Sequence, residues 1–216
     1  MGKGNNKIAE SAAISGLLTG GASETMLMDQ PTYLPPAVNL SDGVVSMRPM
    51  QASDAAALLS ALDDKVAEFV EYAPPEGSDL AAVEAWIEAR NQLMSTGVIC
   101  DWTIVEESTG EIVGWRCLRN KIITADNPAD GKIRTSVFIN PDRRGNRLSP
   151  RSARLAAQFA FDSGVEELLL ALEIENEPSL KNALAAGFKL YETADGLHRL
   201  SMTADELSAA EPFEVS

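Results

Sequence analysis

The sequence is poor in features that mark several common protein classes. Its 216 residues include only two cysteines and one histidine. Cys100 and Cys117 lie in stretches that read as strands, so we expect buried, reduced thiols and no disulfide. No apolar run approaches the roughly 20 residues that cross a bilayer, which excludes a transmembrane protein.

Basic residues are also scarce. The chain has 18 Lys and Arg against 32 Asp and Glu, for a formal net charge of −14. This balance disfavours nonspecific binding to nucleic acid or to anionic lipid, because both need a basic surface. A cationic or neutral amine is an easier partner, although the acidity can equally serve solubility alone.

The remaining composition is ordinary for a globular protein, and the length suits a single domain. We expect a flexible extension over residues 1–42, a domain over residues 43–203 and a tail over residues 204–216. No apolar segment of signal-peptide length follows the first residues, so we expect a cytoplasmic protein. Leu17–Gly21 resembles the double-glycine ending of bacterial leader peptides; the alternative is a flexible or partner-docking tail.

Hydrophobic periodicity predicts alternating strands and helices from Val44 onward. One helix is expected from a cap at Ser53 or Asp54 through Val66, and the run Leu168–Leu172 is expected to be a strand covered on both faces. The other predicted strands are Val44–Arg48, Val98–Val105, Ile112–Leu118, Ile133–Ile139, Phe188–Tyr191 and Leu197–Met202, and a further helix is predicted over Leu80–Leu93. Asn127–Gly131 is expected to form a loop.

Two motifs stand at the starts of the last two large helices. In the first, Arg144–Phe161, Ser149 is the expected N-cap and Pro150 the first helical residue, so free amides would face the loop before them. Such a helix start suits a bound phosphate. In the second, Asn176–Phe188, Asn176 is the expected cap and Gly187 the left-handed residue that ends the helix.

Together the two motifs resemble the acetyl-CoA site of the GNAT family of N-acetyltransferases, in particular its branch that acetylates ribosomal-protein N-termini. The first family motif falls on Arg144, Arg147 and Ser149, where the leading arginine is kept and the later glycine slots are not. The second matches Asn176, Ser179, Gly187 and Phe188. The resemblance covers roughly Val44 to Met202 and implies an α/β fold with a mixed central sheet of about six to seven strands and about four helices.

The resemblance also implies which residues bind acetyl-CoA. A strand amide among Val137, Phe138 and Ile139 would polarise the thioester carbonyl, and the phosphate loop would hold the diphosphate. The full cofactor-binding set is Val137, Phe138, Ile139, Arg144, Gly145, Asn146, Arg147, Leu148, Ser149, Asn176 and Ser179. Glycine at the Arg147 slot would let the backbone approach the phosphates closely, whereas arginine adds charge there. No metal is expected.

The expected catalytic residues are Ser179 and His198. Ser179 would donate a proton or hydrogen bond to the leaving thiolate, although it can instead merely cap the first helical turn. The tyrosine of other family members falls on Ala183, and the glutamate that often serves as base falls on Arg134. His198 is the candidate base, since its ordinary pKa suits proton removal near neutral pH. The alternative is that Glu173 or Glu175, just before Asn176, acts through a water or holds the cationic amine, or is simply a solvated strand end.

Two hypotheses follow. The first is an N-acetyltransferase that acts on a peptide N-terminus, an amino acid or an amine-bearing small molecule. The second is a noncatalytic GNAT-fold module that binds CoA or, through its N-terminal extension, a protein partner. Neither nucleic acid nor a membrane is expected as a partner, and a homodimer is compatible with the sequence.

Overall fold

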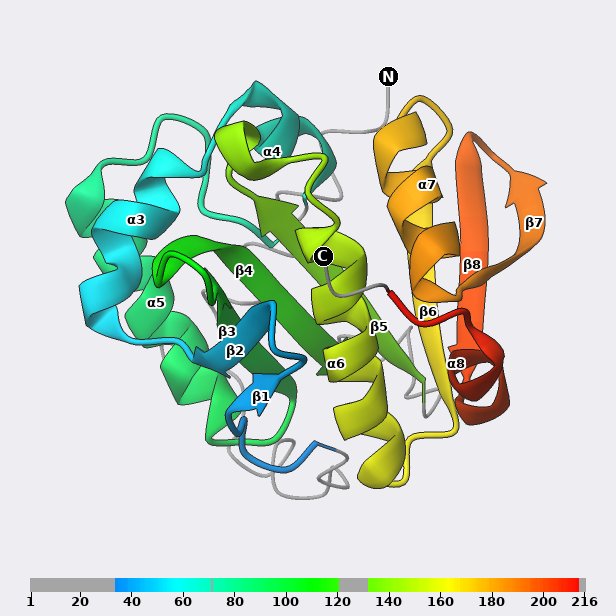
Figure 1. The fold of residues 1–216 in the computed structure, drawn as a ribbon. Coiled ribbons are helices and arrows are strands. Elements are labelled where there is room, and N and C mark those ends of the chain that lie inside the picture. The colour runs from blue at the N-terminus through cyan, green and yellow to red at the C-terminus, as the bar shows by residue number, and fades with distance from the viewer. Residues whose placement is uncertain (1–33, 71, 121–131, 214–216) are drawn as a thin grey trace, which may run out of the picture. The chain divides into compact units, whose positions relative to one another are not determined.

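A computed structural model describes residues 34–70, 72–120 and 132–213, all within the unit formed by residues 33–216 (Figure 1). The described residues form eight strands: β1 Leu40–Ser41, β2 Val45–Pro49, β3 Ile99–Glu106, β4 Glu111–Asn120, β5 Ile133–Ile139, β6 Glu167–Glu173, β7 Lys189–Ala194 and β8 Leu197–Thr203. Their six α-helices are α3 Ala55–Ser60, α4 Asp64–Phe69, α5 Leu80–Met94, α6 Leu148–Asp162, α7 Glu177–Ala186 and α8 Ala204–Ala209. Short 3-10 turns cover Ala52–Asp54 and Pro141–Arg143. The predicted α/β class is confirmed, with one more strand and two more helices than expected.

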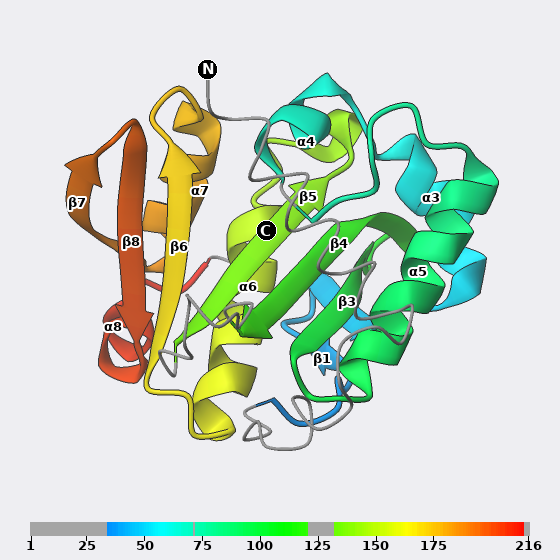
Figure 2. The same cartoon turned by 180° about the vertical axis from the view of Figure 1, so that it is seen from behind.

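All eight strands form one sheet in the order β1-β2-β3-β4-β5-β6-β8-β7. Every neighbouring pair is antiparallel except β5 and β6, which run parallel across the connection made by α6. Parallel pairing at this position is what the predicted strand–helix–strand unit requires. Helices α6 and α7 cover one face of the sheet, and α5 covers the other, as the two opposite views show (Figure 2).

The core lies mainly between the sheet and α6. Trp102 of β3 meets Phe159 of α6 edge to face, with ring centroids 5.2 Å apart. Leu168 and Leu200 extend the same buried cluster beneath α7. In β3 and β4 the alternation of side chains therefore places one set of residues toward α6, such as Trp102 and Arg116, and the other toward α5, such as Asp101 and Trp115.

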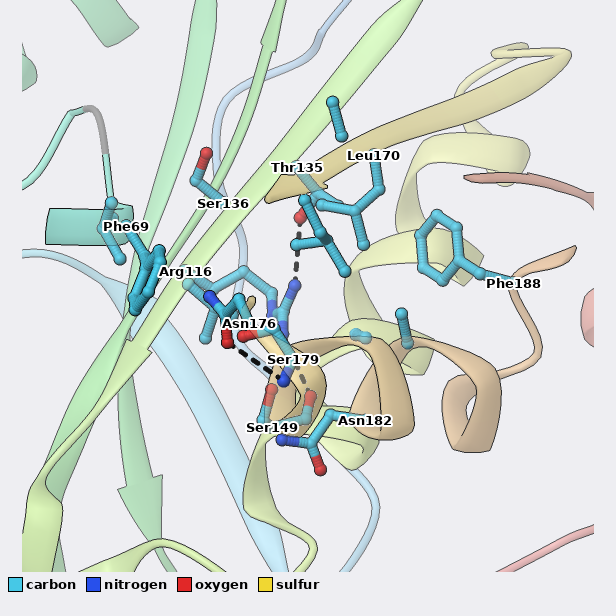
Figure 3. A pocket seen from close by; sticks show the side chains of 16 residues that line it. Phe69, Arg116, Thr135, Ser136, Ser149, Leu170, Asn176, Ser179, Asn182 and Phe188 are labelled. Atoms are coloured by element: carbon cyan, nitrogen blue, oxygen red, sulfur yellow. Dashed lines mark hydrogen bonds between the residues drawn. The ribbon is translucent and has the colours of Figure 1, made fainter. Parts of the chain in front are cut away.

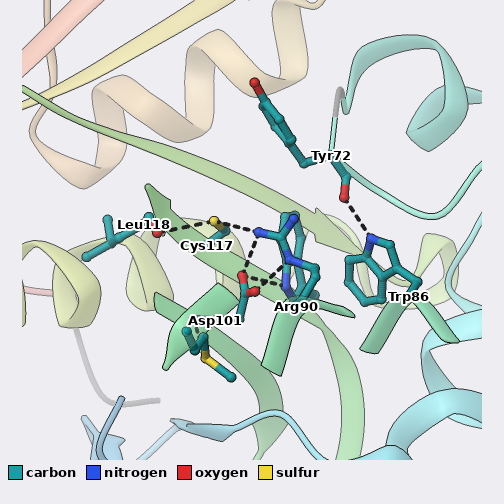
Figure 4. Close-up of polar contacts among 8 residues, drawn as sticks. Tyr72, Trp86, Arg90, Asp101, Cys117 and Leu118 are labelled. Atoms are coloured by element: carbon teal, nitrogen blue, oxygen red, sulfur yellow. Dashed lines mark hydrogen bonds and ion pairs between the residues drawn. The ribbon is translucent and has the colours of Figure 1, made fainter. Parts of the chain in front are cut away.

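A buried polar network holds α5 against the opposite face (Figure 4). Arg90 donates from Nε and Nη2 to the two carboxylate oxygens of Asp101, at 2.6 and 3.0 Å, and also bonds the sulfur of Cys117. Trp115 donates to the same carboxylate at 3.1 Å. Burial alone would lower the pKa of Arg90, but the neighbouring charge of Asp101 outweighs it and raises that pKa. Both carboxylate oxygens are satisfied, as a buried charge requires.

Both cysteines are buried and free, as predicted. Burial is the main reason that the pKa values of Cys100 and Cys117 lie well above that of an ordinary thiol. Neither thiol is therefore suited to act as a nucleophile near neutral pH. No helix within the described ranges is long and apolar enough to cross a membrane.

Three expectations about individual elements were wrong. The single helix expected through Val66 is two helices, because Asp63 caps α4 by accepting a hydrogen bond from the Val66 amide. The helix expected to start at Pro150 begins at Leu148. Strand β6 is not covered on both faces: only Leu168 is fully buried, and Ala171 is exposed.

The C-terminal segment packs along α6. Arg154 donates to the carbonyls of Ala185, Ala186 and Glu211, and its guanidinium lies 3.9 Å from the Phe213 ring. At the other end, Leu34 is buried in the core. The domain limits expected at residues 42 and 203 stay a prediction. Most of the expected extension, residues 1–33, and the expected loop Asn127–Gly131 lie outside the described residues.

Candidate active site

The parallel strands β5 and β6 separate soon after they meet. Their pairing covers only Ile133 with Leu168 and Arg134 with Leu169. Beyond these pairs the strands diverge, and a cavity of about 100 Å³ fills the gap (Figure 3). It is lined by Phe69, Val70, Arg116, Thr135, Ser136, Val137, Ser149, Ala153, Leu170, Ala171, Leu172, Asn176, Ser179, Asn182, Ala183 and Phe188. The divergence leaves β6 partly uncovered and opens the sheet at the carboxyl ends of two parallel strands, where α/β sheets bind ligands.

A second cavity of about 330 Å³ shares seven lining residues with the first: Phe69, Val70, Val137, Ser149, Asn176, Ser179 and Asn182. Its lining also includes Lys65, Val66, Phe138, Ile139, Arg143, Arg144, Gly145, Arg147, Leu148, Pro178 and Lys181. Ten of the eleven residues expected to bind acetyl-CoA line this cavity, and only Asn146 does not. The structure thus gathers residues from β5, the loop after it and α7 around one space.

The loop before α6 presents unpaired amides to this cavity. Within the described residues, no hydrogen bond engages the backbone N–H groups of residues 145–149. Gly145 and Arg147 both have left-handed backbone torsions, with φ of 87° and 58°. Left-handed residues beside a helix start form a concave group of amides that binds anions. The helix dipole of α6 adds to the positive potential at the same place.

Arg147, and not Ser149, precedes the first turn of α6. Its carbonyl accepts the amide of Arg151 at 3.2 Å, which starts the helical hydrogen bonds two residues earlier than expected. Among the residues that the structure describes, no side chain caps this helix start. An arginine in the left-handed region costs about 1–2 kcal/mol relative to glycine, so the strain falls on the slot where the family motif has glycine.

Although the chain is acidic, five cationic side chains line the larger of these two cavities: Lys65, Arg143, Arg144, Arg147 and Lys181. Arg143 pairs with Glu111 and Glu106, and Arg144 pairs with Asp63 at 2.7 Å. The other three have no carboxylate partner within the described part of the chain. Their charge is therefore available to an anionic ligand.

The start of α7 separates the roles of two polar side chains. Asn176 caps the helix, since its Oδ1 accepts the amide of Ser179 at 3.3 Å. The Ser179 hydroxyl has no hydrogen-bond partner among the described residues, and it borders both cavities. Ser179 therefore does not serve as the helix cap, and its hydroxyl is free to donate to a ligand. Gly187 ends α7 with φ of 116°, as expected.

Sequence reasoning missed Arg116, a charged residue in the middle of β4. Its side chain is buried under the first turn of α6 and borders the smaller cavity. It donates to Thr135 Oγ1, Ser149 O and Ser152 Oγ at 2.9, 3.0 and 3.1 Å. Burial lowers its pKa to about 9, so it stays protonated near neutral pH. The signal in the sequence is an arginine within an apolar strand, flanked by Trp115 and Cys117.

His198 borders neither cavity. It lies on β8 opposite Leu172, which does line the smaller cavity, and its Nδ1 is 2.8 Å from Thr193 Oγ1. The residue at the family's glutamate slot, Arg134, also lies outside both cavities. The cavities contain no other histidine, because the chain has one only.

Comparison with known proteins identifies the family of this chain. The model of the GNAT acetyltransferase domain matches residues 45–189, and no curated protein sequence matches the chain. The protein belongs to the GNAT acetyltransferase family.

Solved structures share the fold. RimJ from Mycobacterium smegmatis, in complex with CoA-disulfide, is 21% identical with a TM-score of 0.58 over 79% of this chain and 88% of that one. The ribosomal-protein-S5-alanine acetyltransferase from Vibrio fischeri is 16% identical, with a TM-score of 0.60 over 78% and 97%. FdhC, a nucleotide-linked sugar GNAT, is 15% identical, with a TM-score of 0.63 over 80% and 94%.

Proposed function

We propose that this protein transfers the acetyl group of acetyl-CoA to a primary amine. The observation that carries the proposal is the cluster of unpaired amides at residues 145–149, which opens on a cavity that runs to the gap between β5 and β6. A diphosphate fits the amides, and a thioester fits the gap between the strands. Lys65, Arg147 and Lys181 supply charge for the phosphates.

Acetyl transfer requires three groups of the protein: one that stabilises the oxyanion, one that donates to the leaving thiolate and one that accepts the proton of the amine. The neutral amine attacks the carbonyl carbon, a C–N bond forms, and the C–S bond breaks with its electron pair on sulfur. A backbone N–H on β5, among residues 137–139, would stabilise the developing oxyanion. The Ser179 hydroxyl would donate to the leaving thiolate.

The proton lost by the amine needs an acceptor, and His198 remains our proposed base. Its cross-strand neighbour Leu172 lines the smaller cavity. A general base contributes about 10²–10⁴ in rate, so His198→Gln should lower kcat at least about a hundredfold with little change in the Kd for CoA. An unchanged kcat would remove His198 from the mechanism.

The overall proposal is tested by CoA binding and by thiol release from acetyl-CoA over a panel of amines. The panel includes peptides with N-terminal alanine or serine, free amino acids, small amines and an amine-bearing nucleotide sugar. The alanine peptide and the nucleotide sugar correspond to the names of two similar structures, and the other amines widen the range of acceptors tested. We expect CoA binding and thiol release with at least one amine class. Binding without thiol release from any amine would contradict the enzyme and support a noncatalytic CoA-binding module.

A further inference from the structure

Arg116 is a buried cation without a buried anion to balance it. The residue is 2% exposed, and no carboxylate forms an ion pair with it in the described ranges. Its three acceptors are two hydroxyls and a carbonyl, all neutral. Removing an unpaired charge from water is costly, and neutral hydrogen bonds offset only part of that cost. The comparable buried arginine, Arg90, has the carboxylate of Asp101 at 2.6 Å.

The hydrogen bonds of Arg116 connect it to the start of α6, directly after the loop at residues 144–147. Two of its three acceptors, Ser149 O and Ser152 Oγ, belong to the first turns of α6, and the third, Thr135, lies on β5. Ser149 also lies at the end of the amide cluster and borders both cavities. The guanidinium therefore fixes the orientation of the helix start from beneath. Figure 3 shows it in the same cavity as Asn176 and Ser179.

We propose that Arg116 is a positioning residue for the donor diphosphate: it holds the first turn of α6 in place and supplies, from below, the positive charge that a bound diphosphate balances. This inference rests on the proposed function. A charge in a poorly solvated site acts on a nearby anion more strongly than one at the surface.

The role predicts a dependence on the phosphates of the ligand. In Arg116→Gln the first turn of α6 loses the guanidinium that donates to it, and the positive charge behind that turn, in the smaller cavity, is lost. We expect the Kd for CoA, measured by calorimetry, to rise at least about tenfold, which corresponds to ~1.4 kcal/mol. Pantetheine has no diphosphate, so its Kd should change less than about threefold. If Arg116 had a purely structural role, Arg116→Gln would raise the Kd values for CoA and for pantetheine by the same factor.

Two further variants separate charge from folding. Arg116→Lys keeps the charge without the planar fork, and we expect it to recover part of the lost CoA affinity. The control is Arg199→Gln, which removes an arginine of β8 that pairs with Glu192 and lines neither cavity; its Kd for CoA should stay within about twofold of the wild type. Circular dichroism on each variant identifies any that fails to fold, in which case Arg116→Lys carries the test.

The outcomes are distinct from those of the proposed function. If Arg116→Gln and Arg116→Lys both bind CoA as tightly as the wild-type protein does, the inference about Arg116 is overturned. The proposed acetyltransferase function is then unaffected. Equal losses for CoA and pantetheine in Arg116→Gln would also overturn it. A wild-type protein that binds no CoA would overturn the function itself.

Discussion

Arg144, which lines the larger of the two cavities, and Asp63, 81 residues away in the chain, form a bidentate ion pair. The guanidinium donates from Nη1 and Nη2 at 2.7 and 2.9 Å, and its Nε donates to the Ile139 carbonyl at 3.0 Å. The same carboxylate caps α4. Arg144 thus ties the loop before α6 to the end of β5 and to the start of α4.

Arg144→Ala should weaken CoA binding more than it slows turnover. The loop would lose its anchor to Ile139 and one cation, so we expect the Kd for CoA to rise about tenfold and kcat to change less than about threefold. Asp63→Asn is the matched control, because asparagine can still cap α4 and leaves Arg144 free for phosphate. We expect its CoA affinity to be equal to or higher than that of the wild type. Equal losses in the two variants would show that the ion pair, rather than the charge of Arg144, supports the ligand.

Ser179→Ala should have the opposite effect: it should slow turnover more than it weakens CoA binding. Because Asn176 caps α7 and the serine hydroxyl has no partner among the described residues, the change should leave thermal stability and the Kd for CoA nearly unaltered. Loss of the donor to the thiolate should lower kcat by about tenfold to a hundredfold. Asn176→Ala is the contrast: it removes the cap and should destabilise the protein by about 1 kcal/mol. A full kcat in Ser179→Ala would exclude the serine as the acid.

Arg147→Gly should stabilise the fold. Glycine relieves the strain of a left-handed backbone, although it also adds entropy to the unfolded chain. We expect the free energy of unfolding, from urea titration, to rise by about 0.5–1 kcal/mol. Asp195→Gly is the comparison, since Asp195 has φ of 55° in the turn between β7 and β8, far along the chain from the loop. Aspartate tolerates this region better than arginine, so its gain should be smaller. A loss of stability in Arg147→Gly would contradict the assigned backbone conformation.

Asp54 should make stability depend on pH in the acid range. Burial alone would raise the pKa of Asp54, but hydrogen bonds from Arg48, Thr103 and the Gln51 amide outweigh it and hold that pKa below the ordinary 3.8. A lowered carboxylate pKa contributes stability that is present above the unfolded pKa of about 3.9 and is lost as the pH falls through the folded value. The free energy of unfolding should therefore fall below about pH 4.

The variant Asp54→Asn isolates this contribution. It should be less stable than the wild type at pH 7 by about 1.5–3 kcal/mol, the range for hydrogen bonds to a charged group. The gap between the two proteins should narrow as the pH drops below about 4, because the wild-type carboxylate becomes protonated there. Chemical unfolding at several pH values measures both quantities. A gap that stays constant with pH would contradict the assigned role of the Asp54 charge.

Local signals predicted much of the chain correctly. Strand β5 spans Ile133–Ile139, the range that alternation of its side chains indicates. Helix α7 has the expected cap at Asn176 and the expected left-handed end at Gly187. These features depend on residues within one or two turns of each other, so a single sequence contains the information.

Two of the differences have different causes. The helix expected through Val66 breaks at Asp63, which caps α4 through an amide only three residues along the chain, a local signal that hydrophobic periodicity does not detect. Strand β6 looked fully covered because it is apolar, yet its divergence from β5 leaves Ala171 exposed. The exposure of β6 has no local signature, since it depends on which segment lies beside the strand.

The sequence by itself determined the family, the order of the main elements and the residues that gather around the donor cavity, because motif spacing and hydrophobic periodicity are properties of neighbours along the chain. Only the tertiary structure decided that Arg144 is held by Asp63, that the Ser179 hydroxyl makes no hydrogen bond among the described residues, and that Arg116 lies buried against the first turn of α6. The reason is physical: the charge state and the hydrogen bonds of a side chain depend on the groups that folding brings against it and on the water that folding removes.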